Sequence, residues 1–269
     1  MKEWKVISNY ENALPPKFSY RRYRSKSNFY ALIIVAKNEG ERLVRQLKNI
    51  EECVSNNVDV IIADGPSDDG STAEGVMEAH NVHCVISVAE GGGLSAALQG
   101  SIKYALDEGY LGIIMMDGNE KDGVDAVPRF IEKMELGFDY IQGSRFMVEG
   151  RYDNTPLKRL ILIKLIHAPL VSFLSRRWLT DTTNGFRAFR AKFLKNPDLA
   201  IFDPDFTAYE LPYYLAWFAC RNKFQVAQIP VARVYPADGT VPTKIIGLAG
   251  HWKMLRPLLL MAFSWNKWC

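Results

Sequence analysis

The sequence predicts an α/β protein in which a mainly parallel sheet is flanked by helices. Between residues 29 and 144, short apolar runs of strand length alternate with segments of helical periodicity, which is the pattern of strand–helix–strand crossovers. The runs are apolar throughout, as in strands that helices cover on both faces. With 48% hydrophobic and 23% charged residues, the composition excludes disordered, collagen-like and coiled-coil chains.

Five strands and four intervening helices are expected in the first half of the chain. Apolar runs predict strands at 29–35, 58–63, 83–88, 111–117 and 138–144. Helical periodicity predicts helices at 40–54, 71–80, 93–108 and 124–136. After residue 150 the alternation breaks, and the expected elements are helices at 156–176, 209–220 and 243–264 and a strand at 224–235.

We interpret residues 1–28 as a basic N-terminal arm and residues 29–269 as a single domain. The first thirty residues carry seven Lys and Arg side chains against two Glu. An arm of this kind suits contact with anionic lipid or an acidic partner, or a solvated extension. Within the domain, residues 29–145 form a nucleotide-type half, and residues 146–269 are expected to complete the pocket.

The net charge, the cysteines and the apolar stretches indicate which partners and which cellular compartment are expected. A net charge of +3 is too small to indicate a nucleic-acid partner. The four cysteines form no C-x-x-C pair, which suits a reducing, cytoplasmic compartment. The apolar stretches 157–174 and 255–263 are interrupted or short, so neither is expected to span a bilayer. Both suit burial against the core or peripheral contact with the inner face of a membrane.

Polar or glycine residues follow all five predicted strands at their carboxyl ends, where open parallel sheets bind ligands. They are Asn38 and Glu39; Asp64, Asp68 and Asp69; Gly91, Gly92 and Gly93; Asp117, Asn119, Glu120 and Asp122; and Ser144 with Arg145. One such ending is ordinary turn chemistry, but five in succession favour a shared site.

The expected ligand of this site is a metal-bound diphosphate. Carboxylate and amide oxygens suit Mg²⁺ or Mn²⁺, and a glycine loop before a helix suits phosphate. The chain has neither G-x-x-x-x-G-K-[ST] nor a G-x-G-x-x-G after its first strand. Those absences argue against a nucleotide hydrolase and a dinucleotide oxidoreductase.

Six segments together resemble the family-2 glycosyltransferases of the GT-A fold, near the polyprenyl-phosphate mannosyl- and glucosyltransferases. They are LIIVAKNEG (32–40), IIADGPSDDGS (61–71), EGGGLSAALQGSIKYA (90–105), MMDGN (115–119), GSRF (143–146) and DTTNGFRAF (181–189). The resemblance implies a GT-A fold with a nucleotide half, 29–145, and an acceptor half, 146–269. The chain departs from the family pattern at Val35, Gly65, Gly92 and Asn119, where the family has Pro, Asp, Lys and Asp.

The resemblance also implies a role for each matching residue. The nucleotide would be bound by Val35, Asn38, Glu39, Asp64, Gly92 and Asp117. The divalent cation on the donor diphosphate would be held by Asp117 and Asn119. Phosphate oxygens would be bound by Arg145, Arg187, Arg233 and Lys244. The catalytic carboxylate on the acceptor side would be Asp181, with Glu210 as the second candidate.

The expected activity is inverting transfer of a sugar from a nucleotide-diphosphate sugar to a polyprenyl phosphate or a glycan, in cell-surface polysaccharide or glycoconjugate synthesis. A hydroxyl acceptor needs a carboxylate to take its proton, whereas a lipid phosphate is already ionised. Two alternatives stay open: a sugar nucleotidyltransferase, and a GT-A-like nucleotide-binding module that has lost turnover.

Overall fold

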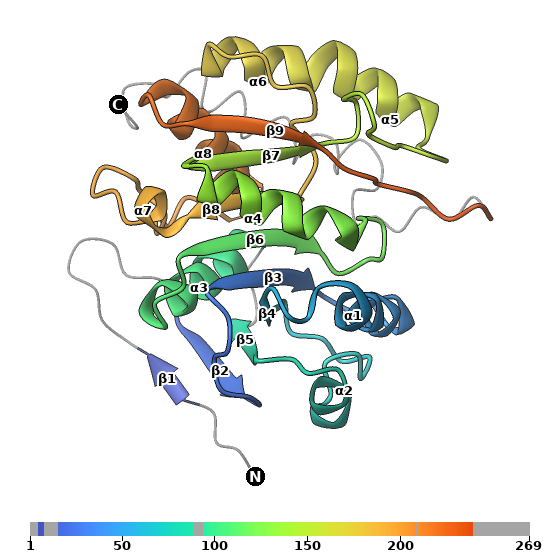
Figure 1. Cartoon of the computed structure of the whole chain (residues 1–269), viewed down its shortest axis with the longest axis vertical. Helices are drawn as coiled ribbons and strands as arrows, with labels where there is room; N and C mark the ends of the chain where they lie inside the picture. The colour runs from blue at the N-terminus through green and yellow to red at the C-terminus, as the bar shows by residue number, and fades with distance from the viewer. Residues whose placement is uncertain (1–4, 8–15, 89–93, 208, 239–269) are drawn as a thin grey trace.

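The computed structural model describes residues 5–7, 16–88, 94–207 and 209–238. Within them, nine strands form one sheet in the order β1-β2-β5-β4-β3-β6-β8-β7-β9, with helices on both sides (Figure 1). The strands are β1 (Lys5–Ile7), β2 (Phe18–Arg22), β3 (Tyr30–Ala36), β4 (Asp59–Asp64), β5 (Cys84–Val88), β6 (Gly112–Asp117), β7 (Tyr140–Ser144), β8 (Arg187–Arg190) and β9 (Val226–Pro230). This architecture confirms the predicted α/β class.

The helices divide between the two faces of the sheet. They are α1 (Glu41–Val54), α2 (Glu74–Ala79), α3 (Leu94–Asp107), α4 (Val127–Glu135), α5 (Leu157–Leu162), α6 (Ala168–Ser175), α7 (Ala191–Leu194) and α8 (Glu210–Arg221). Apolar residues of α1, α2 and α4 pack in one core, and those of α3, α6, α7 and α8 pack in the other. Because side chains alternate along a strand, β3 sends Ala31 and Ile33 into one core and Leu32 and Ile34 into the other.

The sheet is mixed: a central block of parallel strands is flanked by the antiparallel strands β2 and β8. Strands β5, β4, β3 and β6 form this parallel block, as predicted. Strand β8 lies between β6 and β7 and runs antiparallel to both. The sequence pattern does not predict a strand at Arg187–Arg190, because two arginines in four residues obscure the apolar pattern of a buried strand.

The second antiparallel strand, β2, lies within the segment that the sequence pattern presents as a basic arm. Residues Phe18–Arg22 pair antiparallel with β5, and Phe18 is buried in the core. The sheet therefore begins before residue 29. The predicted start of the domain, after residue 28, is therefore too late. The basic residues around Phe18 obscure the apolar pattern of this strand in the sequence.

The predicted helix 156–176 forms as α5 and α6 joined by a π-helical turn, Ile163–His167. Pro169 has no N–H to donate to the preceding turn, and this accounts for the local widening of the helix. The side of this helix that faces away from the core exposes Leu157, Ile161, Leu165, Ile166 and Phe173. None of the helices in the described part of the chain has the length and apolar character that a membrane span requires. The predicted helix 243–264 lies outside the described residues.

Candidate active site

The carboxyl ends of β4, β3 and β6 bring the predicted nucleotide-binding residues to one edge of the sheet. Ala36 is in register with Asp64, and Val35 is in register with Asp117. Asn38 and Glu39 follow β3 directly on the same edge. The structure therefore gathers these residues as the sequence pattern indicated, although they are up to 82 positions apart (117 − 35).

Asp64 organises the loop that follows β4. Its carboxylate accepts hydrogen bonds from the Ser67 backbone N–H at 3.1 Å and from the Ser67 hydroxyl at 2.7 Å. Ser67 in turn accepts from the Asn38 backbone N–H at 3.0 Å, and the Asn38 side chain accepts from the Asp68 N–H at 2.9 Å. The loops after β3 and β4 are thus tied together. Sequence reasoning did not identify Ser67, although a serine three residues after a capping Asp is a recognisable turn signal.

Asp117, at the end of β6, is the centre of a charged cluster. Its Oδ2 accepts from Arg233 Nη2 at 2.5 Å, and Arg233 Nη1 donates to both oxygens of Asp122 at 2.7 Å. Burial alone would raise the pKa of Asp117, but the charges of Arg233 and Lys121 lower this pKa to about 2. A Cβ at Gly185 would lie 2.9 Å from Asp117 Oδ1, so the backbone approaches this carboxylate as closely as only glycine permits.

Two further cations, Lys121 and Arg159, lie at this cluster. Lys121 is 4% exposed, and its Nζ lies 5.0 Å from the ring centroid of Tyr235. Burial, followed by the charge of Arg233, lowers the pKa of Lys121 to about 7. Arg159 projects from α5, with its Cζ 6.0 Å from the same ring, and burial lowers its pKa as well. Sequence reasoning missed both residues.

The charges of this cluster favour an anionic ligand. With every group ionised, three cations (Lys121, Arg159 and Arg233) face two carboxylates (Asp117 and Asp122). The balance is one positive charge in excess. A diphosphate or an ionised phosphate monoester supplies the opposite charge, and such contacts are strong where water is largely excluded.

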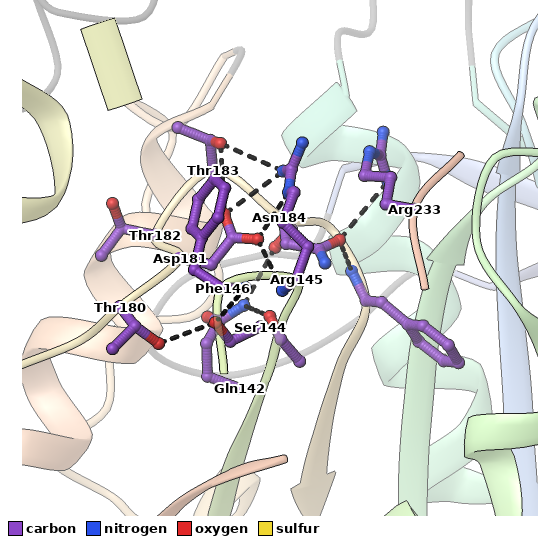
Figure 2. A network of polar contacts seen from close by, with 12 residues as sticks. Gln142, Ser144, Arg145, Phe146, Thr180, Asp181, Thr182, Thr183, Asn184 and Arg233 are labelled. Atoms are coloured by element: carbon purple, nitrogen blue, oxygen red, sulfur yellow. Dashed lines mark hydrogen bonds and ion pairs between the residues drawn. The ribbon is translucent and has the colours of Figure 1, made fainter. Parts of the chain in front are cut away.

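Asp181 and Arg145 form an ion pair that solvent does not reach (Figure 2). Both side chains are 0% exposed, and Asp181 accepts from Arg145 Nε at 2.6 Å, Nη2 at 3.2 Å and the backbone N–H at 3.1 Å. Arg145 Nη1 is buried without a hydrogen-bond partner among the described residues. The Nη1 nitrogen of Arg145 thus keeps unpaired N–H groups, and neither it nor Asp181 has exposed surface in the described part of the structure.

The remaining predicted site residues have other surroundings. Arg187 donates to the backbone carbonyls of Asn184 and Thr182, each at 2.8 Å, and to that of Pro212. Its guanidinium therefore holds the loop before β8, and the structure does not turn it toward the Asp117 cluster. Glu210, the first residue of α8, accepts from the Thr207 N–H at 3.1 Å, so its carboxylate holds the turn before this helix. Gly92 and Lys244 lie outside the described residues.

Asp117 and Asn119 offer few ligands for a resident divalent cation. Asp117 Oδ2 already accepts from Arg233, and Asn119 Nδ2 lies 3.5 Å from the same oxygen. Asn119 Oδ1 is buried and has no partner within the described part of the chain. No group of three or more His, Cys, Asp or Glu side chains suited to a metal occurs among the described residues. One shared carboxylate and one amide oxygen, next to the Lys121 ammonium, do not fit a preformed metal centre.

A parallel α/β edge with a carboxylate cluster and convergent cations is a site suited to a phosphorylated ligand. The sequence pattern of Glycosyl transferase family 2 matches residues 31–198, more than half of the chain, so the chain belongs to glycosyl transferase family 2. It is a glycosyltransferase, and its fold is of the GT-A type, as the resemblance implied.

Curated relatives lie in the branch that the resemblance indicated. The polyprenol monophosphomannose synthase of Mycolicibacterium smegmatis is 28% identical over 74% of this chain and 75% of the relative. The undecaprenyl-phosphate mannosyltransferase of Micrococcus luteus is 26% identical over 84% of this chain and 97% of the relative. Among solved structures, glucosyl-3-phosphoglycerate synthase from Mycobacterium tuberculosis, in complex with Mn²⁺, UDP and glucosyl-3-phosphoglycerate, has a TM-score of 0.62 at 16% identity, over 87% of this chain and 78% of that chain.

Proposed function

We propose that this glycosyltransferase moves a sugar from a nucleotide-diphosphate sugar to a polyprenyl phosphate, with inversion at the anomeric carbon. The names of the two curated relatives support this acceptor class. The product would serve the synthesis of cell-surface polysaccharide or glycoconjugates.

The helix α5–α6 carries the structural argument for a lipid phosphate. Its outer side exposes Leu165 at 71% and Phe173 at 80%, and Arg159 on the same helix interacts electrostatically with Asp117 and Arg233. The outer side of α5–α6 would lie in the interface of a bilayer, and the same helix would place the Arg159 cation at the reaction centre. This arrangement suits an acceptor with a long apolar tail and an ionised head, and it supports peripheral contact with a membrane.

The chemistry proposed is a single displacement. An oxygen of the acceptor phosphate attacks the anomeric carbon, a new C–O bond forms, and the bond between that carbon and the diphosphate oxygen breaks. The leaving nucleoside diphosphate keeps the electron pair, and the cations Arg159 and Arg233 stabilise the charge that develops there. The acceptor phosphate is already ionised, so no base is required, which agrees with the pairing of Asp181 to Arg145 and of Glu210 to the Thr207 N–H.

On the donor side, Asp64 would contact the nucleoside and Asp117 the diphosphate. Asp64 and Asp117 lie on the same edge of the sheet, one on each side of β3. The sequence predicts Mg²⁺ or Mn²⁺ at Asp117 and Asn119, whereas the contacts of these residues do not fit a preformed metal centre. Transfer measured with Mn²⁺, with Mg²⁺ and with EDTA decides between the two.

Incubation of the full chain with radiolabelled UDP-, GDP- and CDP-sugars and undecaprenyl phosphate in detergent tests the proposal. Label should pass into the organic phase from one donor, and the product's anomeric configuration should be opposite to that of the donor. Asp117→Ala should abolish transfer, and Asp153→Ala, at an exposed carboxylate, should not. Label found only in a water-soluble glycan would contradict the lipid acceptor, and nucleotide binding without any transfer would indicate a module that has lost turnover.

A further inference from the structure

We propose that the Lys121 ammonium, together with the Arg233 guanidinium, supplies at the donor diphosphate the positive charge that a divalent cation supplies in metal-dependent transferases. The chain would then bind nucleoside diphosphates without a metal ion. This inference depends on the proposed function, because it assumes a nucleotide-diphosphate donor.

The backbone after β6 directs Lys121 into the protein. Glu120 has a φ of 60°, a left-handed conformation that costs energy in a residue with a side chain. Gln46 holds this turn at two points: its Nε2 donates to the Asp117 carbonyl at 2.9 Å, and its Oε1 accepts from the Glu120 N–H at 2.8 Å. Glu120 points outward to Arg45, at 2.9 Å. The next side chain, Lys121, is therefore directed inward by contacts on either side.

Arg233 is fixed beside Lys121 by both acidic residues of the cluster. It bridges Asp117 and Asp122, and its neighbour Val234 donates its backbone N–H to the Lys121 carbonyl at 2.8 Å. The two cations thus come from segments that the fold holds against each other. Groups held in place before the ligand arrives stabilise charge better than mobile ones, because they need not reorganise.

The charge balance argues against an additional divalent cation. With every group ionised, Lys121, Arg159 and Arg233 exceed the two carboxylates by one charge, and a cation at Asp117 would be repelled by all three. Its oxygen ligands from the described residues would be those of Asp117 and Asn119, and Arg233 holds one of the Asp117 oxygens. Beside these oxygens, Lys121 supplies a buried ammonium that interacts with Asp117, and an ammonium repels a metal ion and attracts a phosphate.

Calorimetric titration of the full chain with UDP, GDP and CDP, in EDTA and in excess Mn²⁺, tests this inference. The nucleotide that binds best should show dissociation constants within about twofold of each other in the two conditions. Lys121→Gln should weaken binding in EDTA by roughly tenfold or more, the usual size of a lost charge-assisted contact. Mn²⁺ should restore the affinity of this variant, because the glutamine amide adds an oxygen ligand beside Asp117 and Asn119.

Two control variants and a direct metal readout complete the design. Lys121→Arg keeps the charge and should still bind in EDTA, and Lys48→Gln, at an exposed lysine of α1, should behave as wild type. Relative to the same mixture of Mn²⁺ and nucleotide without protein, the electron paramagnetic resonance signal of free Mn²⁺ should fall further with Lys121→Gln but not with wild type. This signal reports metal binding independently of catalysis.

Each other outcome has a defined meaning. Wild-type binding that requires Mn²⁺ would overturn the inference and leave the proposed function intact. Unchanged affinity of folded Lys121→Gln in EDTA would remove Lys121 from the diphosphate site. Failure to bind any of the three nucleotides in either condition would overturn the proposed function and the inference together. If Lys121→Gln does not fold, the wild-type titrations in EDTA and Mn²⁺ still show whether nucleotide binding requires a metal ion.

Discussion

Replacing Asp181 by Asn removes the negative charge from an ion pair that the fold has buried completely. Arg145 and Asp181 are both 0% exposed and share two side-chain hydrogen bonds. Removing one partner of such a pair leaves the other charge buried and uncompensated, at a cost of about 3–5 kcal/mol. For a chain of this length, at roughly 2 °C per kcal/mol, the expected fall in melting temperature is about 6–10 °C.

Thermal and urea unfolding of Asp181→Asn, Arg145→Met and the double variant measure this effect. Because the residues are in direct contact, the double variant should lose less than the sum of the single losses, with a coupling of about 2–3 kcal/mol. The matched control is Asp153→Asn, since Asp153 pairs with Arg151 at the exposed surface. Surface pairs contribute about 0–1 kcal/mol, so the control should unfold close to wild type.

The same variants distinguish a positioning role for Asp181 from the role of a catalytic base. Through Arg145, Asp181 controls where the unpaired Nη1 donor lies. Loss of stability and weaker acceptor binding are therefore expected together in Asp181→Asn. If this variant instead unfolds like wild type, binds nucleotide normally and loses turnover by a factor of about 10²–10⁴, Asp181 is the catalytic base and its positioning role is refuted.

Three further outcomes are expected. Asp64→Ala should weaken nucleoside diphosphate binding roughly tenfold in titration calorimetry, because it releases the loop after β4, whereas Asp68→Ala, at an exposed side chain, should not. Burial, with the charge of Arg187, lowers the pKa of His167 to about 4. The free energy of unfolding should therefore be unaffected by His167 protonation above pH 6.5 and should fall by about 3 kcal/mol as the pH is lowered to 4, because the unfolded chain takes up the proton first. If the free energies of unfolding of wild type and His167→Gln fall in parallel over this pH range, this expectation is wrong. Phe173→Ser should reduce sedimentation with phosphatidylglycerol vesicles at low salt about tenfold or more, and Leu136→Ser, at an exposed apolar residue of another surface, should leave it unchanged.

The position of the site was predictable because it depends on local signals. A buried parallel strand that ends in a carboxylate places this carboxylate at one edge of the sheet, and neighbouring strands share that edge. This reasoning located Asp64 and Asp117, and the register of β3 with β4 and β6 agrees with it. The apolar pattern of each strand and the carboxylate at its end were sufficient for this placement.

The partners of the arginines were not predictable, because they depend on contacts between distant segments. Arg145 and Asp181 are 36 residues apart, and Arg187 reaches the carbonyl of Pro212, 25 residues away. The family motif indicated that both arginines matter but not whether phosphate or protein takes their donors. Lys121 was missed for the same reason: its inward direction follows from Gln46, 74 residues before Glu120 in the chain.

The available donors of each cation decide which of them can act on a ligand. Arg187 has a carbonyl partner for each of its three nitrogens, so binding a phosphate would break contacts that hold the loop before β8. Arg145 has one unpaired nitrogen among the described contacts, and its geometry is set by Asp181. Arg233 and Lys121 neutralise carboxylates in the cluster, and an arriving diphosphate would add negative charge where cations are in excess. Nucleotide titrations should therefore be most sensitive to Lys121 and Arg233. Substitution of Arg145 should show instead in acceptor binding, and substitution of Arg187 in stability alone.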